Sequence, residues 1–225
     1  MTRLVCLANS YKHGERCIAG KSLETGAWVR PVSDVGHGEV PWKARLIGGR
    51  EPLPLDILDI PLEAGGPDCG CQPENRLLAP GEWRKAGRMA ADEVLKYVDE
   101  VAERPLFYNY VDRVPMTLFA RIPRPRWRSL QLVHCYHADF HRDAPGTAGV
   151  LRSDGWRVTF DYRGAEYAGL KVTDPVALVR LARGEQMDGP FVLTVSLGMP
   201  FRPTNTSKEY CFKLVAAVVR LKDFS

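Results

Sequence analysis

The stretch RCIAGKSLETGAWVRPVS, residues 16–33, decides how the rest of the chain is interpreted. Two short runs, CIAG at 17–20 and AWVRPV at 27–32, flank a polar turn that contains Gly26. The second run alternates apolar and polar residues, as a half-buried strand does. A glycine-bearing turn between two such runs predicts a β-hairpin.

Alternation in this hairpin places Trp28 and Arg30 on one strand face and Val29 on the other. An aromatic ring and a guanidinium side by side on an open face can stack on a base or grip a phosphate. The same residues fit a plainer arrangement, with Trp28 in the core and Arg30 as a solvated surface charge. The pattern alone leaves both interpretations open.

Patterns of the same kind predict strands along the rest of the chain, at 2–8, 16–22, 27–33, 55–62, 116–122, 129–141, 155–162, 166–172, 191–197 and 210–221. A helical period predicts a helix over 90–104, and the pair Asp174-Pro175 predicts the start of another, over 175–183. The second half therefore reads as three strands, a helix and two strands, the order of an OB-fold. The first half has four strands before its helix, one more than that order requires.

The expected fold is mostly β: two OB-like five-stranded barrels packed together, with one or two short helices. We assign the first barrel to residues 1–125, including the helix at 90–104. The second takes residues 126–225, including the helix at 175–183.

Four segments carry a family resemblance: RCIAGKSL…GAWVRPVS, LDILDIPL, CQPEN, and SLGMPF…YCFKLVAAVVRL near the end. They resemble the bacterial dual OB-containing domain family over nearly the whole chain. In that family the Gln-x-Glu-Asn part of CQPEN recurs, whereas the cysteines do not. The resemblance implies an accessory module of nucleic-acid-directed systems, anti-phage defence among them.

Composition is that of an ordinary globular protein, with 225 residues and a formal net charge of +4. That mildly basic balance admits a nucleic-acid partner without requiring one. The N-terminal sequence lacks a signal-peptide pattern, and no apolar run has the length of a membrane span. Six scattered cysteines read as reduced thiols, so we expect a cytoplasmic protein with no membrane association.

Two clusters invite a metal-site interpretation. His134, His137 and His141 lie within eight residues, but strand geometry points 134 and 137 to opposite faces. Cys69 and Cys71 form a CxC in a loop, with no second pair at zinc-ribbon spacing. We therefore predict no metal and no cofactor. We also predict no catalytic residue, because the sequence shows no nucleophile motif and its carboxylates are dispersed.

Basic residues supply the candidate binding site. The run 121–128 holds four arginines and Trp127, which suits single-strand binding but equally a stiff, solvated linker. The loop 201–208 lies between the last two strands, next to the usual OB ligand face, and the loop 9–16 has a similar composition. The predicted nucleic-acid-binding residues are Lys12, Arg16, Trp28, Arg30, Arg126, Trp127, Arg128, Arg202, Asn205 and Lys208.

The leading functional prediction is non-catalytic binding of single-stranded nucleic acid or of a nucleotide-like ligand. One alternative is a protein-interaction subunit that docks on a partner enzyme. Another is a nuclease or nucleotide hydrolase whose catalytic groups converge only in the folded chain.

Overall fold

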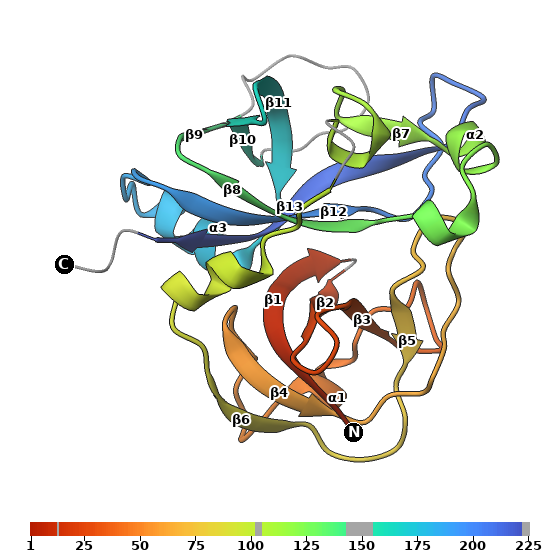
Figure 1. Cartoon of the computed structure of the whole chain (residues 1–225), viewed down its shortest axis with the longest axis vertical. Coiled ribbons are helices and arrows are strands. Elements are labelled where there is room, and N and C mark those ends of the chain that lie inside the picture. Colours follow the sequence, from red (N-terminus) through yellow and green to blue (C-terminus); the bar gives the residue numbers. More distant parts are fainter. Residues whose placement is uncertain (13, 102–104, 143–154, 222–225) are drawn as a thin grey trace.

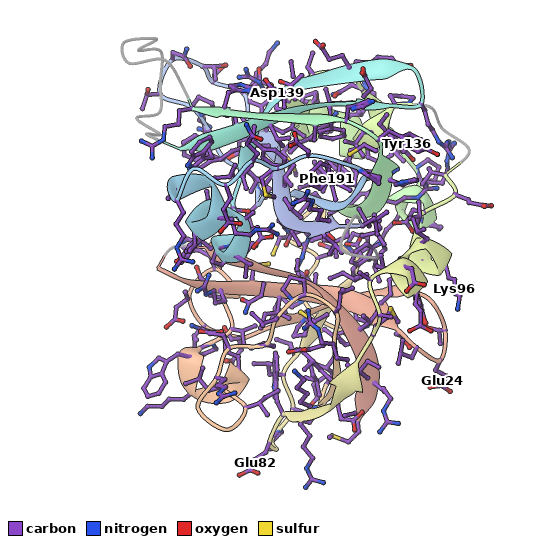
Figure 2. All side chains as sticks on the ribbon, turned by 90° about the vertical axis from the view of Figure 1, so that its left-hand side faces the viewer. Glu24, Glu82, Lys96, Tyr136, Asp139 and Phe191 are labelled. Carbon is purple, nitrogen blue, oxygen red and sulfur yellow. The ribbon has the colours of Figure 1, made fainter. Side chains whose placement is uncertain are left out.

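The computed structural model describes residues 1–12, 14–101, 105–142 and 155–221. Two β-sheets lie one on the other, the N-terminal sheet below and the C-terminal sheet above in both views (Figures 1 and 2). Phe191 lies inside the upper half, while Glu82 projects from the far end of the lower half (Figure 2). The expectation of a mostly β protein is confirmed, and in place of one or two short helices the described residues form three short α-helices and three short 3-10 helices.

The first sheet has six strands in the order β5-β3-β2-β1-β4-β6, and a one-turn helix, α1, lies between β3 and β4. Its elements are β1 (Thr2–Lys12), β2 (Glu15–Ser22), β3 (Trp28–Val32), α1 (Trp42–Arg45), β4 (Asp56–Ile60), β5 (Asn75–Leu77) and β6 (Arg84–Arg88). The four strands expected at 2–8, 16–22, 27–33 and 55–62 are all present.

The hairpin of β2 and β3 is confirmed, with Lys21 opposite Trp28. The amide of Ser22 donates to the carbonyl of Ala27 across the turn at 2.9 Å. On the strand before the turn, Gly20 lies so close to β1 that a Cβ atom there would stand 2.1 Å from the Val5 carbonyl oxygen. The close approach of β1 and β2 therefore requires glycine at this position.

The second sheet runs in the order β8-β12-β13-β11-β10-β9, with β7 paired to the outer end of β13. Its strands are β7 (Arg113–Pro115), β8 (Leu130–Cys135), β9 (Ala138–Arg142), β10 (Trp156–Tyr162), β11 (Ala165–Val172), β12 (Phe191–Leu197) and β13 (Tyr210–Arg220). The helices of this half are η2 (Leu106–Tyr108), α2 (Met116–Phe119), η3 (Arg124–Arg126) and α3 (Pro175–Ala182).

Counting β8 and β9 as one strand interrupted at 136–137, the two sheets share one set of neighbours. In each, the first strand pairs with the second and the fourth, and the third runs parallel to the fifth. Apart from the added strands β6 and β7, each half therefore follows the OB order of three strands, a helix and two strands. The extra strand counted in the first half disappears, because α1 occupies the helix position before β4.

The structure corrects the expectation of two barrels, because neither sheet closes into a barrel among the described residues. Among the described residues, β5 and β6 are the two edges of the first sheet, and a single isolated bridge from Leu62 to Leu78 links the chain just after β4 to the chain just after β5. The second sheet is interrupted where β8 ends and β9 begins. Two open sheets that follow the OB strand order replace the two closed barrels.

The predicted helix at 90–104 is also wrong in extent, since its described part is one short 3-10 helix, η1 (Asp92–Tyr97). Val98 is extended, and the next residue, Asp99, turns its carboxylate onto β8 and the β2–β3 hairpin. These contacts outweigh the local helical period. Residues 102–104 lie outside the described part of the chain.

Two of the predicted strands also differ from those observed. The segment 116–122 begins with the helix α2, and the strand of that region, β7, precedes it. The segment 129–141 is divided into β8 and β9. Both differences involve short apolar runs, for which periodicity does not separate helix from strand or locate a break.

The second helix agrees with its prediction and ends one residue earlier, at Ala182. Asp174 caps it by accepting hydrogen bonds from the amides of Val176 and Ala177. The other carboxylate oxygen of Asp174 accepts from the Val218 amide on β13 at 2.8 Å. Burial raises the pKa of Asp174, and these three amide donors oppose that rise.

Replacing Asp174 by alanine is expected to lower the free energy of unfolding by about 2 kcal/mol, because three buried or partly buried amides lose their acceptor. Chemical denaturation monitored by far-ultraviolet circular dichroism would measure the change. Asp188→Ala, on an exposed loop carboxylate, is the matched control. Equal effects from both variants would contradict the capping role.

The two sheets pack through a continuous apolar layer. Val5 and Leu7 of β1 meet Leu132, Val192 and Val219 of the second sheet, and all five are buried. The Thr194 hydroxyl donates to the Leu7 carbonyl at 2.6 Å across this layer. The outer face of β1, β2 and β3 is thus covered by the second sheet.

The segment 106–119 was assigned to the first half by sequence, and its side chains pack in the core of the second sheet. Leu106, Phe107, Val114 and Phe119 belong to the apolar cluster that includes Tyr167. The division at 125 stays a prediction, and this packing favours a boundary near residue 100. No helix in the described part of the chain is long and apolar enough to span a membrane.

Candidate nucleic-acid interface

Trp28 and Arg30 share one face, as predicted, and that face is turned toward the second sheet. The Arg30 side chain is 1% exposed, and its Nη2 lies 3.1 Å from Ser196 Oγ on β12. The Trp28 indole nitrogen donates to Asp99 at 2.9 Å. The expectation of an open, ligand-facing pair is therefore wrong, because the second sheet covers these residues.

The Gln-x-Glu-Asn part of CQPEN joins the two sheets. Gln72 Nε2 donates to the Leu197 carbonyl of β12 at 3.0 Å. The Glu74 carboxylate accepts from the backbone amide and the hydroxyl of Ser129 at 2.8 and 2.7 Å. Asn75 accepts from Arg30 and donates to Gln72. The motif thus acts as an internal clamp and is not part of an open ligand site.

Arg16 belongs to a charged network within the first sheet. Its guanidinium lies 4.1 Å from the centre of the Tyr11 ring and 4.0 Å from a Glu51 oxygen. Glu51 also pairs with the buried Arg45, and these contacts offset the effect of burial and leave the pKa of Glu51 lowered. Lys12 ends β1, beside the same loop. The expected loop 9–16 is thus mostly the paired ends of β1 and β2, which this network stabilises, and the role of Lys12 and Arg16 in ligand binding stays a prediction.

The arginine-rich run divides into a packed and an exposed part. The Trp127 ring contacts Phe119 edge to face, with centroids 5.5 Å apart, and its Nε1 donates to the Ile122 carbonyl. Trp127 is therefore used for packing. Arg126 is exposed and Arg128 half-buried, and Arg124 pairs at 2.6 Å with Asp68, in the connection between β4 and β5.

The loop between β12 and β13 presents Arg202, Asn205 and Lys208 on the surface. Arg202 pairs with Glu209 at 3.2 Å, and an isolated bridge joins Phe201 to Tyr210 at the base of the loop. In Figure 1 this loop stands at the upper right, beside β7 and α2. These three predicted residues lie together, on the border of the outer face of the second sheet.

Next to this loop is an aromatic ladder that sequence reasoning missed. Arg113 of β7 lies opposite Phe212 of β13, and its guanidinium is 5.2 Å from that ring and 5.7 Å from the Tyr210 ring. Phe201 lies 6.2 Å from Phe212, centre to centre, and is 43% exposed. Three rings and a guanidinium therefore share one surface.

The same surface continues across β11 and β10. Lys171 pairs with Leu214, which follows Phe212 on the same face of β13, and Arg157 of β10 pairs with Lys171. Residues paired in register share a face, so two more basic side chains border the ladder. We define the aromatic–basic face by Arg113, Arg157, Lys171, Phe201, Tyr210 and Phe212.

The position of the aromatic–basic face in the fold explains why it is open to a ligand and why the sequence did not reveal it. β10 and β11 are the second and third strands of the second OB order, and their outer face is the usual OB ligand face. The corresponding face of the first sheet is covered by the second sheet. Alternation in YCFKL puts Tyr210 and Phe212 on one strand face, a signal that was not used, and the register with β7 and β11 cannot be read from sequence.

The opposite end of these strands is acidic. Asp139, Asp161, Glu166 and Asp188 line a shallow hollow of about 340 Å³ together with His137. The change from basic to acidic side chains runs along β10 and β11. A polyanion would therefore be held at the end near the aromatic ladder and repelled at the other.

The inner face of β13 carries a buried lysine. Lys213 is 2% exposed, and its ammonium donates to the carbonyl and side-chain oxygens of Asn109 at 2.7 and 2.9 Å. Its Nζ lies 5.3 Å from the centre of the Tyr167 ring. Burial lowers the pKa of Lys213 to about 7, and the charge of Asp112 opposes that shift.

The histidine cluster is not assembled by the fold. His134 lies on β8 against Tyr136, while His141 lies on β9 beside Asp139. Cys69 is half-buried and Cys71 fully buried. Within the described ranges, no group of three or more His, Cys, Asp and Glu side chains is arranged to hold a metal ion.

Comparison with protein families matches residues 2–218 to a family described as the dual OB-containing domain. The match covers both sheets and the clamp between them. No curated protein and no solved structure matches the chain.

Proposed function

Since the chain belongs to the dual OB-containing domain family, we propose that it is a non-catalytic module that binds single-stranded nucleic acid on the aromatic–basic face of its second sheet. The observation that carries the proposal is the ladder of Phe201, Tyr210 and Phe212 with the guanidinium of Arg113 against two of the rings.

In this proposal the exposed ring faces stack on bases, which gives binding with little sequence preference. Lys171, Arg157 and the loop residues Arg202 and Lys208 neutralise phosphates, so affinity falls as salt concentration rises. Asn205 adds a neutral hydrogen-bonding group at the rim. The exposed Arg126 extends the basic surface on the neighbouring segment.

The asymmetry of the two sheets supports a single binding face. The first sheet uses the outer face of its second and third strands to dock on the second sheet, through Lys21, Trp28 and Arg30. The second sheet packs through β8, β12 and β13, which leaves the outer face of β10 and β11 exposed to solvent. The first sheet thus supports the second sheet, and the second sheet carries the ligand.

Binding to a fluorescein-labelled oligothymidylate, followed by anisotropy, is expected to weaken by about tenfold or more in the double variant Arg113→Ala/Phe212→Ala, because one stacking surface and its cation are lost. The matched control is Arg84→Ala/Lys85→Ala, on exposed residues of β6 in the first sheet. Equal weakening in the control would show that only net charge matters.

The salt dependence of the wild-type affinity forms the second part of this test. We expect weaker binding at 200 mM than at 50 mM salt, and a shallower slope in Lys171→Ala/Lys208→Ala. Absence of binding to single-stranded DNA and RNA at low salt would overturn the proposal.

For its setting, we propose a bacterial cytoplasmic accessory of a nucleic-acid-directed system such as anti-phage defence. The family membership supports this assignment by analogy. For the enzymatic alternative, the hollow beside His137 does gather four carboxylates, but no group of His, Cys, Asp and Glu among the described residues is arranged to hold a catalytic metal ion.

A second candidate function, docking on a partner enzyme, is favoured by a hollow of about 520 Å³ on the first sheet. Val35 in its lining is 61% exposed, and the neighbouring helix α1 carries Trp42, which is 52% exposed. An apolar surface of this kind is typical of protein contacts. Co-purification of a partner that Val35→Asp abolishes, without loss of nucleic-acid affinity, would establish this second role.

A further inference from the structure

Three sulfur atoms meet where the two sheets join. Cys211 Sγ on β13 lies 3.1 Å from Cys71 Sγ, in the loop between β4 and β5, and 3.4 Å from Met116 Sδ at the start of α2. The cysteines are 140 positions apart in the chain. The fold therefore brings together a thioether and two thiols from three separate segments.

The surroundings hold these atoms in a dry, closely packed position. Cys71 and Cys211 are both fully buried. A Cβ atom at Gly70 would stand 3.0 Å from the Met116 methyl group, so the loop packs tightly against that side chain. The contact with Cys211, and then burial, raise the pKa of Cys71.

The donor set decides which ligand fits. Thiolate and thioether sulfurs select soft cations, Cu(I) above all, whereas structural zinc usually takes four nitrogen or sulfur ligands from Cys and His. We propose that Cys71, Cys211 and Met116 form a site for one Cu(I) ion. On binding, each thiol releases its proton to solvent and forms one Cu–S bond, and Met116 donates a lone pair with no proton change.

Arg30 supplies the charge that such a site needs. A Cu(I) ion with two thiolates carries one net negative charge, which is costly to bury without a counter-charge. The Arg30 guanidinium is fully buried, and its hydrogen-bond partners, Asn75 Oδ1, Ser129 O and Ser196 Oγ, are all neutral. Its Nε has no hydrogen-bond partner in the described structure, and its charge acts to lower the pKa of Cys71, whereas the charge of Glu74 acts to raise it.

The competing product of this geometry is a disulfide. Two thiols would lose two protons and two electrons to a small-molecule disulfide such as oxidised glutathione, which is reduced to two thiols. Such a bond leaves no thiolate for a metal and does not use Met116. The two outcomes therefore differ in metal content, in thiol count and in their dependence on Met116.

The test is an anaerobic titration of the full chain with Cu(I) against the chromogenic chelator bathocuproine disulfonate, with metal content read by native mass spectrometry. One copper per chain is expected, with loss of binding in Cys71→Ser and a weakening of about tenfold or more in Met116→Leu. Cys69→Ser, two residues from Cys71 in the same loop, is the matched control and should bind as the wild type does.

Met116→Leu keeps the volume and apolar character of the side chain, so it reports on the sulfur even where Cys71→Ser alters folding. Copper that stays with the chelator, binding unchanged in Met116→Leu, or a Cys71–Cys211 disulfide formed in place of metal uptake would each overturn the proposal. Cys211 lies between Tyr210 and Phe212 on β13, but its side chain is on the opposite, buried face of the strand, so the copper titration reads out a different site from the oligonucleotide assay.

Discussion

Replacing Asp99 by alanine is expected to lower the free energy of unfolding by about 4 kcal/mol, because this carboxylate serves three donors at the junction of the sheets. It accepts from Lys21 Nζ at 2.6 Å, from the Trp28 indole at 2.9 Å and from the Leu132 amide at 2.7 Å. The Lys21 side chain is 8% exposed, so the variant leaves a buried ammonium without a counter-ion.

Urea denaturation followed by tryptophan fluorescence would measure this loss, since Trp28 reports on the junction itself. Glu100→Ala, on the exposed neighbour, is the matched control and should change stability by less than about 0.5 kcal/mol. Asp99→Asn keeps the shape and removes the charge, so an intermediate loss is expected. If Asp99→Ala lowered the free energy of unfolding no more than Glu100→Ala does, the Asp99 carboxylate would not hold the sheets together.

The second large effect is a dependence of stability on pH that originates at Lys213. Burial lowers the pKa of this lysine from 10.5 to about 7 in the folded chain. Between these two pH values the unfolded chain binds more protons than the folded one, so the free energy of unfolding rises with pH. Between pH 7 and pH 9 the rise from this group is about 2 kcal/mol. Below pH 7 both states are protonated and the penalty is fully present.

Lys213→Met should remove this rise, because methionine fills the same space and does not titrate. Lys171→Met, on the exposed face of β11, is the matched control and should keep it. The measurement is the free energy of unfolding at several pH values between 7 and 9, compared between the two variants. Equal slopes for Lys213→Met and the wild type would contradict the assignment. The range stops at pH 9 because burial raises the pKa of the Cys6 thiol to about 12. Above pH 9 this thiol makes the free energy of unfolding fall with pH, which would mask the contribution of Lys213.

Some residues of the candidate site could be predicted from the sequence, and others could not. The loop 201–208 was identified from the order of strands, and Arg202, Asn205 and Lys208 lie on the surface as expected. Arg113 and Lys171 were missed, because their place beside Phe212 depends on strand pairing between segments about 100 and 40 residues from it. Trp127 has a ring suited to stacking on bases, but the half-buried ring packs against the core of the second sheet.

By itself, the sequence determined the features that depend on neighbouring residues. It predicted the β2–β3 hairpin, the capped start of α3 and the alternation that puts Trp28 and Arg30 on one face, because turn chemistry and side-chain period act over a few residues. Tertiary structure alone decided what covers each face. The second sheet buries Arg30, Asp99 ends the helix begun at Asp92, and β13 brings Cys211 to Cys71. Burial depends on contacts between segments distant in the chain, and no local pattern contains them.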